Sequence, residues 1–317
     1  MISCRSLAFA LVIARVISCA NSVGADDFRL AQNPRELIIT CNGHALATYL
    51  WRDDKILRPY FKNVRTLDHL QVTRTHPPIP GRDAMDHADM HPGIWLAFGA
   101  LNDQDFWRNK AKVEHERFIE QPFARGDEAG FTALNRYVST NGQLICRETC
   151  RIRFKSRPKG WWLLWDSWFE SDQAEFVFGD QEEMGLGVRL ATPLTVKQGG
   201  AILNSSGGQN EKGTWGKTAD WIDDFGNVEG KTVGLMLMPD PANFRPAWFH
   251  SRDYGLVVAN PFGQNAFTKG EKSQIVVKTG ERFRLRYGLL VHSSSPEKPL
   301  NRSAVYQAYL KDLLRTK

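Results

Sequence analysis

The sequence has 317 residues, of which 42% are hydrophobic and 24% charged, and its formal net charge is +6. Basic and acidic residues are interspersed, with no basic run long enough to follow a phosphate backbone, which argues against nucleic acid as a partner. No segment approaches the roughly 20 consecutive apolar residues that a membrane-spanning helix needs, so we expect no transmembrane segment.

The first 25 residues have the pattern of a secretion signal. Arg5 precedes an apolar run over residues 7–17, and small side chains before Asp26 suit a signal peptidase. We therefore predict a signal peptide over residues 1–25 and one exported domain over residues 26–317, periplasmic or extracellular. An alternative is a lipobox at residues 16–19, in which Cys19 would carry a lipid anchor. Ordinary secretion is favoured, although Arg15 interrupts the apolar run and fits neither pattern well.

Three cysteines remain after removal of the leader, namely Cys41, Cys146 and Cys150. In an extended strand Cys146 and Cys150 would lie about 13 Å apart, at roughly 3.3 Å per residue. A disulfide tolerates a Cα separation of only about 7 Å, so these two are not expected to pair without a bulge or turn. Cys41 could pair with either. The odd number leaves at least one thiol outside any intrachain bond.

Strand patterns dominate the rest of the chain. Residues 36–40 and 45–50 flank an Asn42-Gly43 turn, and residues 131–139 lead through Asn141-Gly142 into a second hairpin. Polar and apolar residues alternate over 151–154 and again over 283–287, which is typical of strands with one buried face. Short strands separated by Gly, Asn and Pro predict an all-β protein, a large antiparallel β-sandwich.

One helix is predicted, at the C-terminus. Ser303 could cap a helix over residues 304–314, whose apolar side chains recur at spacings of three and four. We expect it to pack on the sandwich as a closing element.

Two long segments do not follow the strand pattern, residues 76–93 and 205–224. Their content of aromatic and ionisable side chains favours binding loops over disorder. In the first, His87 and His91 would share one face of a helical turn, the spacing that zinc ligands use, but no third ligand is evident. A site in which a histidine and a neighbouring Asp exchange protons is favoured over metal binding, and histidines that merely bond loop carbonyls are the structural alternative.

Acidic residues gather at residues 179–189, where Asp180, Glu182 and Glu183 precede what we expect to be a Gly-x-Gly turn at Gly185 and Gly187. One of two adjacent carboxylates could face a cleft while the other faces water. The glycines would permit close approach of a ligand or of another strand. A solvated acidic turn is the structural alternative.

A third mixed stretch, residues 248–255, contains His250, Arg252 and Asp253 beside aromatic residues. Arg offers several donors to hydroxyls or to a carboxylate. In the Trp-rich run at 161–168, a strand would place Trp161 and Trp165 on one face and Trp162 and Trp168 on the other. Tryptophan beside carboxylates suits sugar rings, although tryptophans that fill the space between two sheets are the structural alternative.

Taken in order, these segments resemble the PmoA-like family, whose members are often labelled "methane oxygenase PmoA" in bacterial genomes. The resemblance covers nearly the whole chain after the leader. It is carried by Arg-Pro-Tyr-Phe at 58–61, Val-Thr-Arg at 72–74, Asp-His at 86–87, His-Pro-Gly-Ile-Trp at 91–95, Asp-Phe-Trp at 105–107, Gly-Asp at 179–180, Gly-Val-Arg at 187–189, Trp-Phe-His at 248–250, Arg-Asp-Tyr-Gly at 252–255 and Asn-Pro-Phe-Gly at 260–263. Many relatives have Asp-His-Pro-His-His-Arg-Gly where this chain reads Asp-His-Ala-Asp-Met-His-Pro-Gly, which argues against a multi-histidine metal site.

The methane monooxygenase subunit of that name is a bundle of membrane helices, whereas this chain has no spanning segment, so we discount methane oxidation. The family is similar in fold to the galactose mutarotase-like supersandwich, which also hosts sugar lyases and hydrolases. That fold implies a site on a concave sheet where His and carboxylate groups handle sugar protons. The resemblance therefore implies a carbohydrate-active protein.

We accordingly expect an enzyme that acts on a saccharide or modified sugar as a hydrolase, lyase or epimerase, without a cofactor. The expected proton-transfer or orienting groups are His87, His91, His250 and Glu183. The expected substrate-binding residues are Arg74, Trp95, Asp180, Glu182, Trp221, Arg252 and Asp253. A non-catalytic carbohydrate-binding protein is the alternative, and a metal-dependent oxidoreductase is a third hypothesis.

Overall fold

The computed structural model describes residues 26–315, which form two large antiparallel sheets and a two-stranded one. The nine-stranded sheet has the order β1 (Phe28–Gln32), β2 (Glu36–Cys41), β3 (His44–Leu50), β4 (Tyr60–Lys62), β5 (Ile94–Phe98), β11 (Met184–Arg189), β17 (Leu256–Asn260), β16 (Trp248–Arg252) and β13 (Lys217–Thr218). The eight-stranded sheet has the order β12 (Ala201–Asn204), β14 (Ile222–Val228), β15 (Lys231–Pro239), β19 (Phe283–Ser294), β9 (Gly160–Glu170), β8 (Leu144–Arg157), β7 (Glu128–Val138) and β6 (Lys112–Arg125). Strands β10 (Phe176–Phe178) and β18 (Ile275–Val277) form the small sheet.

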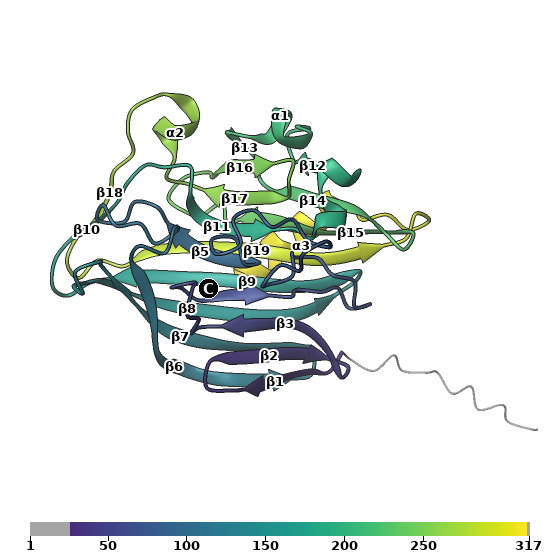
Figure 1. The fold of residues 1–317 in the computed structure, drawn as a ribbon, viewed down its shortest axis with the longest axis horizontal. Coiled ribbons are helices and arrows are strands. Elements are labelled where there is room, and N and C mark those ends of the chain that lie inside the picture. Colours follow the sequence, from purple (N-terminus) through teal and green to yellow (C-terminus); the bar gives the residue numbers. More distant parts are fainter. Residues whose placement is uncertain (1–25, 316–317) are drawn as a thin grey trace, which may run out of the picture.

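The two large sheets pack face to face, because alternate side chains of each are apolar and point inward. Phe61 of β4 meets Phe154 of β8 with ring centroids 5.9 Å apart, and Phe98 of β5 meets Phe169 of β9 at 5.5 Å. These residues belong to one continuous buried core. In Figure 1, β1, β2 and β6 lie together at the bottom of the molecule, and β13 and β16 lie at the top near α1 (Asn210–Thr214) and α2 (Gln264–Thr268).

The predicted all-β sandwich with a C-terminal helix is confirmed, and so are both predicted hairpins, β2–β3 and β7–β8. The helix, α3 (Arg302–Arg315), packs Tyr309 and Leu313 against the outer face of the eight-stranded sheet. Its predicted cap is wrong: Ser303 lies inside the helix, and the side chain of Asn301 accepts the hydrogen bond from the Ala304 N–H, at 3.0 Å.

Two predictions at 185–224 need correction. Gly185 and Gly187 do not form a turn but lie inside β11, with neighbours paired on both sides. The segment 205–224 contains α1 and β13, and its last residues belong to β14. Segment 76–93, by contrast, has no strand or helix of its own, as predicted.

The predicted leader and Cys19 fall outside the described residues. Cys41, Cys146 and Cys150 are buried, and none of the three is in a disulfide. No helix within residues 26–315 has both the length and the apolar character needed to cross a bilayer.

One carboxylate faces the core without a partner. Asp224 of β14 pairs with Ile202 and Leu235, two core residues, and neither of its carboxylate oxygens has a hydrogen-bond partner within residues 26–315. Burial, reinforced by the nearby Asp223, raises the pKa of Asp224 well above its usual value. The folded protein therefore holds this group protonated at a pH where the unfolded chain has already released the proton.

Replacing Asp224 by Asn tests this assignment through the pH dependence of stability. Because the folded pKa is raised, the contribution of Asp224 to stability is greatest below its unfolded pKa and is lost as pH rises towards the folded pKa. Asn does not titrate, so the stability of Asp224→Asn relative to the native protein should increase from pH 4 to pH 7, at up to about 1.4 kcal/mol per pH unit. Chemical denaturation at each pH measures the difference. A constant difference would contradict the raised pKa.

Candidate functional site

The outer face of the nine-stranded sheet, the face turned away from the core, carries a row of aligned residues. Backbone pairing places Tyr60 of β4 beside Trp95 of β5, Trp95 beside Gly187 of β11, Gly187 beside Val258 of β17, and Val258 beside His250 of β16. The row joins segments that are up to 190 positions apart in the sequence. The row brings the acidic residues 179–189 and the mixed stretch 248–255 onto one surface.

Gly187 is required at the centre of this row because two indole rings lie over it. A Cβ atom at Gly187 would lie 2.7 Å from Cζ2 of Trp95 and 3.1 Å from Cη2 of Trp107, closer than side chains normally pack. The expected close approach at this glycine thus involves tryptophans of the same chain. The sequence predicted that Trp95 binds the substrate. Its side chain is 0% exposed, so it cannot stack directly on a ligand.

The segment 76–93 crosses this face as an ordered loop, held from below by two buried arginines. The guanidinium of Arg74 donates to the backbone carbonyls of Ala84, Asp86 and His91 at 2.6–2.9 Å. Arg58 donates to the carbonyls of Met90 and Trp107. Burial lowers the pKa of Arg58 to about 9 and of Arg74 to about 10.

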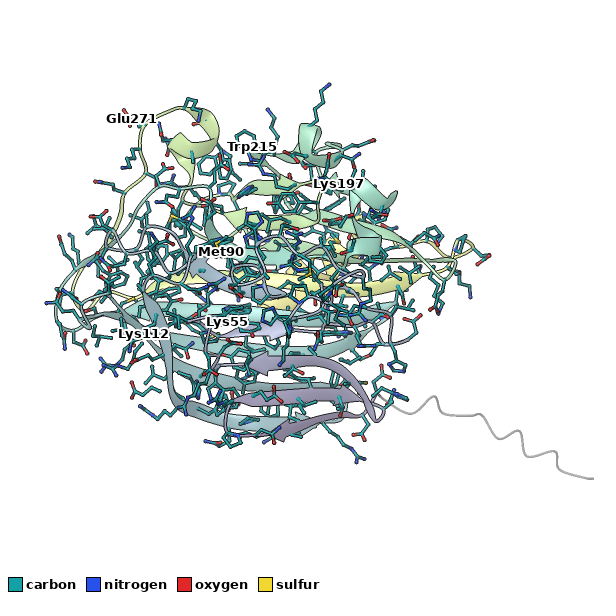
Figure 2. All side chains as sticks on the ribbon, viewed as in Figure 1. Lys55, Met90, Lys112, Lys197, Trp215 and Glu271 are labelled. Carbon is teal, nitrogen blue, oxygen red and sulfur yellow. The ribbon has the colours of Figure 1, made fainter. Side chains whose placement is uncertain are left out.

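Arg74 therefore anchors the loop and does not bind substrate hydroxyls. Its side chain is only 1% exposed, and its guanidinium is occupied by the loop carbonyls. The prediction that Arg74 contacts the ligand is wrong for this reason. In Figure 2, Met90 of this loop lies near the middle of the view, with Trp215 and Lys197 above it and Lys55 below.

At the exposed side of the loop, Asp86 and His87 form a hydrogen-bonded pair. Nδ1 of His87 lies 3.0 Å from Oδ2 of Asp86, and Arg189 of β11 donates to both oxygens of the same carboxylate at 2.8 and 2.7 Å. Burial opposes ionisation of Asp86, but the bonds from Arg189 and His87 outweigh it and hold its pKa well below the usual value. The ionised Asp86 fixes the orientation of the His87 ring and directs Nε2 away from the carboxylate.

Four rings form a stack that leads from the buried sheet to the surface. His91 lies over Trp95 with centroids 5.2 Å apart, His87 lies 5.0 Å from His91, and Tyr254 lies 6.2 Å from His87, all within 24° of parallel. The His87 side chain is 44% exposed, whereas His91 is 4% exposed. Of these two histidines, only His87 can reach a ligand.

His91 is a neutral, buried ring. Nε2 of His91 accepts a hydrogen bond from the indole N–H of Trp107 at 3.3 Å, which an imidazolium could not do. Burial and the positive charge of Arg189 lower the pKa of His91 well below its usual value. We therefore assign His91 a positioning role beneath His87, in place of the proton-transfer role that its sequence neighbourhood suggested.

His250 is neutral for similar reasons. Its Nε2 accepts from the Arg252 Nε–H at 3.1 Å, and its Nδ1–H donates to the backbone carbonyl of Glu182 at 3.3 Å. Burial, reinforced by Arg252, lowers the pKa of His250 to about 4. The His250 side chain is 5% exposed and both of its ring nitrogens are occupied. His250 therefore does not have the proton-transfer role that the sequence predicted.

Carboxylate–arginine pairs line the opposite end of the site. Arg252 lies over the Trp215 ring and binds Glu182 at 3.1 Å and Glu211 of α1 at 2.8 Å. Arg108 binds Glu183 at 2.9 Å. All five charged groups are between 28% and 36% exposed, so they can meet a ligand.

Three of the predicted binding residues have structural roles instead. Asp180 accepts the backbone N–H groups of Asn265 and Ala266 at the start of α2. One Asp253 oxygen accepts the Glu211 N–H, which fixes α1. Trp221 packs against Met236 and Tyr309 on the outer face of the other sheet, under α3, and is not part of this site.

The site also contains four residues that were not predicted from the sequence, namely Arg108, Arg189, Glu211 and Tyr254. Arg189 and Tyr254 stood within two of the motifs, but their partners, Asp86 and His87, are distant in the sequence. Within residues 26–315 no group of three or more His, Cys, Asp or Glu side chains is arranged to hold a metal ion.

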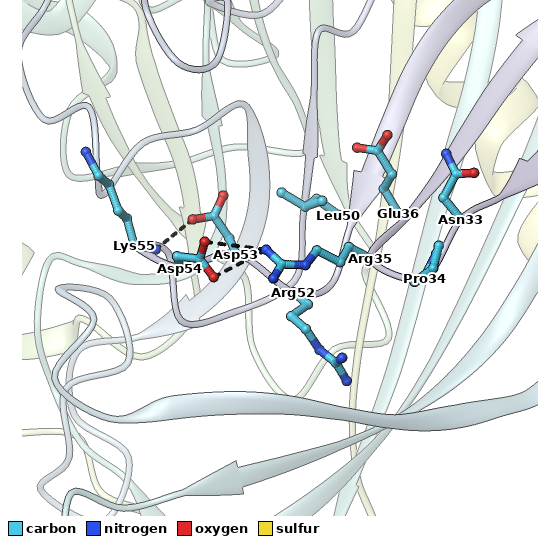
Figure 3. A pocket seen from close by; sticks show the side chains of 9 residues that line it. All are labelled: Asn33, Pro34, Arg35, Glu36, Leu50, Arg52, Asp53, Asp54 and Lys55. Carbon is cyan, nitrogen blue, oxygen red and sulfur yellow. Dashed lines mark hydrogen bonds and ion pairs between the residues drawn. The ribbon is translucent and has the colours of Figure 1, made fainter.

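A separate hollow of about 610 Å³ lies at the other end of the same sheet (Figure 3). Its lining residues are Asn33, Pro34, Arg35, Glu36, Leu50, Arg52, Asp53, Asp54 and Lys55. Arg35 pairs there with the exposed Asp54 at 3.3 Å. None of the predicted site residues lines the hollow, and its Arg35–Asp54 pair is exposed to solvent, so the hollow does not compete with the His87 region as a reactive site.

Comparison with known proteins gives a family but no activity. A family model described as "Family of unknown function (DUF6807)" matches residues 36–304. No curated protein matches the sequence. Among solved structures, the GH36 alpha-galactosidase AgaA from Geobacillus stearothermophilus is similar with a TM-score of 0.41 and 9% sequence identity, and the match covers 84% of this chain. The chain spans 40% of the length of that enzyme.

Proposed function

The chain belongs to DUF6807, a family of unknown function, and from the geometry of its site we propose that it binds a saccharide and acts on it by acid–base chemistry. The reaction would be that of a hydrolase, lyase or epimerase. His87 is the proposed proton-transfer residue. The observation that carries the proposal is the half-exposed pair of His87 with an ionised Asp86, in which His87 lies between His91 and Tyr254 in the ring stack, on the face that also presents the Glu182 and Glu183 pairs.

The chemistry follows from the state of each group. Nε2 of His87 can take a proton from a sugar C–H or O–H and return it to a second atom, while Asp86 stabilises the imidazolium that forms. Arg252 and Arg108 can donate to sugar hydroxyls, and Glu182, Glu183 and Glu211 can accept from them. Tyr254 and Trp215 offer half-buried rings beside these polar groups, an arrangement suited to the mixed surface of a sugar.

Non-catalytic saccharide binding is the second candidate, and a specific observation favours it. Glu182 and Glu183, which directly precede β11, are both held in ion pairs with arginine, which suits recognition of hydroxyls better than proton transfer. In that case His87 would only line the site. Affinity would then survive its loss, and would fall when Arg252 is replaced.

The test is a panel of mono- and oligosaccharides, each screened for an increase in melting temperature and then for turnover by product analysis. A saccharide bound at 100 times its Kd adds about 2.7 kcal/mol to the free energy of unfolding, which a thermal scan detects readily. The proposal predicts at least one ligand, and a changed product from it. Absence of any stabilising saccharide would rule out both candidates, whereas binding without product would select the second.

On the basis of the leader-like first 25 residues we propose further that the protein meets its saccharide outside the cytoplasm. Separating the cell fractions and determining the N-terminus of the purified protein would test this. A mature N-terminus at Asp26 would support ordinary secretion, one at Cys19 would support a lipid anchor, and an intact leader on cytoplasmic protein would contradict export.

A further inference from the structure

Positive groups converge on Tyr254 at the loop end of the site. The Arg189 guanidinium lies 4.6 Å from the centre of the Tyr254 ring, the Lys197 ammonium lies 5.9 Å from it, and the His87 ring lies 6.2 Å away. Arg74 is also nearby, since its guanidinium lies 3.8 Å from the Asp86 carboxylate that Arg189 binds. Figure 2 shows Lys197 at the outer surface of this region.

The Asp86 carboxylate at this end of the site is already paired with protein groups. The carboxylate of Asp86 receives two bonds from Arg189 and one from His87, and burial leaves Arg74 with only backbone carbonyls as close partners. Lys197 is exposed and has no carboxylate within ion-pair distance among residues 26–315. Two buried arginines and one exposed lysine therefore gather here, and both arginines lie within ion-pair distance of one carboxylate, that of Asp86.

Donor groups without protein partners also gather here. The Tyr254 hydroxyl has no hydrogen-bond partner within residues 26–315, and burial raises the pKa of Tyr254, so the phenol remains a donor at neutral pH. The Lys197 ammonium adds three N–H donors. A ligand atom beside the Tyr254 ring would thus meet donors and positive charge, and few acceptors.

The opposite end of the site is balanced in charge. Glu182 and Glu183 pair there with Arg252 and Arg108, and Glu211 lies between the two ends, because its carboxylate accepts the N–H of Asp253, next to Tyr254. The excess of positive groups is therefore confined to the end beside Tyr254. A uniformly neutral ligand would gain nothing from this asymmetry, whereas a ligand with an anionic group at one end and hydroxyls at the other would match it.

We infer that the saccharide of the proposed function, on which this inference rests, carries an anionic group that binds between the Lys197 ammonium and the Tyr254 hydroxyl, with the His87 ring beside it. A carboxylate, as in a uronic acid, is the group that this set of donors fits, and a sulfate ester shares the same chemistry. The neutral hydroxyls of the sugar would then face the glutamate–arginine pairs of the other end.

The experiment compares matched ligands by isothermal titration calorimetry on the wild-type protein. Each uronate oligosaccharide is paired with its carboxyl-reduced counterpart, which has CH2OH in place of the carboxylate, and each sulfated oligosaccharide with its desulfated form. We expect one anionic member to bind at least roughly tenfold more tightly than its neutral counterpart, as a charged hydrogen bond provides. The pair that shows this preference distinguishes a carboxylate from a sulfate.

Variants then locate the anionic group. Lys197→Met should weaken binding of the preferred anionic ligand roughly tenfold and leave its neutral counterpart within about twofold. Tyr254→Phe, which keeps the ring beside the sugar, should weaken binding of the anionic ligand by a larger factor than binding of the neutral one. Lys272→Met, at an exposed lysine in the loop after α2, is the matched control and should change neither.

The outcomes distinguish failure of the anionic-group inference from failure of the proposed saccharide function. Equal binding of anionic and neutral partners, or an anionic preference that survives both variants, would overturn this inference and leave the proposed function standing. Failure of every saccharide to bind would overturn the proposed function itself.

Discussion

Arg74→Met is expected to lower the free energy of unfolding by at least about 3 kcal/mol and to release the loop that carries His87. Arg74 is 1% exposed and donates to the carbonyls of Ala84, Asp86 and His91. Methionine removes the cost of burying a charge, but it leaves these carbonyls without a donor, at about 1–3 kcal/mol each where water cannot replace it. The loss of partners should outweigh the saving.

Chemical denaturation gives the stability change, and amide hydrogen exchange over residues 84–91 reports the loop directly. Arg52→Met is the matched control, since Arg52 is exposed, and it should change stability by no more than about 0.5 kcal/mol. If Arg74→Met lowered the stability by less than about 1 kcal/mol and left exchange at the loop unchanged, the loop would be held by something other than this guanidinium.

The fold could be predicted from the sequence because its determinants are local. Alternation of polar and apolar residues at 151–154 and 283–287 marks strands β8 and β19, and Asn42-Gly43 marks the turn between β2 and β3. The glycines of β11 were misread as a turn because only the distant Trp95 and Trp107 explain Gly187. A residue pattern carries no record of a packing partner 80 or 90 positions away.

The candidate site could be predicted only as a set of segments. The structure brings segment 76–93, residues 179–189 and residues 248–255 to one face, but the state of each histidine depends on contacts that the segments do not encode. His91 and His250 are neutral because Trp107 and Arg252 donate to them in buried positions. His87, with a similar sequence environment to His91, differs because its side chain lies on the exposed side of the loop.

This difference between the histidines leads to the largest expected effect on activity. On a saccharide that the protein turns over, His87→Gln should lower kcat roughly 10²- to 10⁴-fold, the usual contribution of a general acid–base group. Glutamine keeps a polar side chain of similar reach but cannot accept and return a proton. The ring stack below it, His91 on Trp95, does not depend on the exposed imidazole, so the variant should remain folded.

Three comparisons separate proton transfer from mere contact. His44→Gln, at an exposed histidine of β3, is the control and should leave kcat unchanged. Asp86→Asn should lower kcat with a smaller change in KM, because the imidazolium loses its stabilising carboxylate while the ligand-facing Nε2 remains. His250→Gln should instead raise KM, since it disturbs Arg252 and Glu182, which face the ligand. A His87→Gln protein with full turnover would show that the imidazole only lines the site, and the proton would then have to move through Glu183, the partly exposed carboxylate that Arg108 holds.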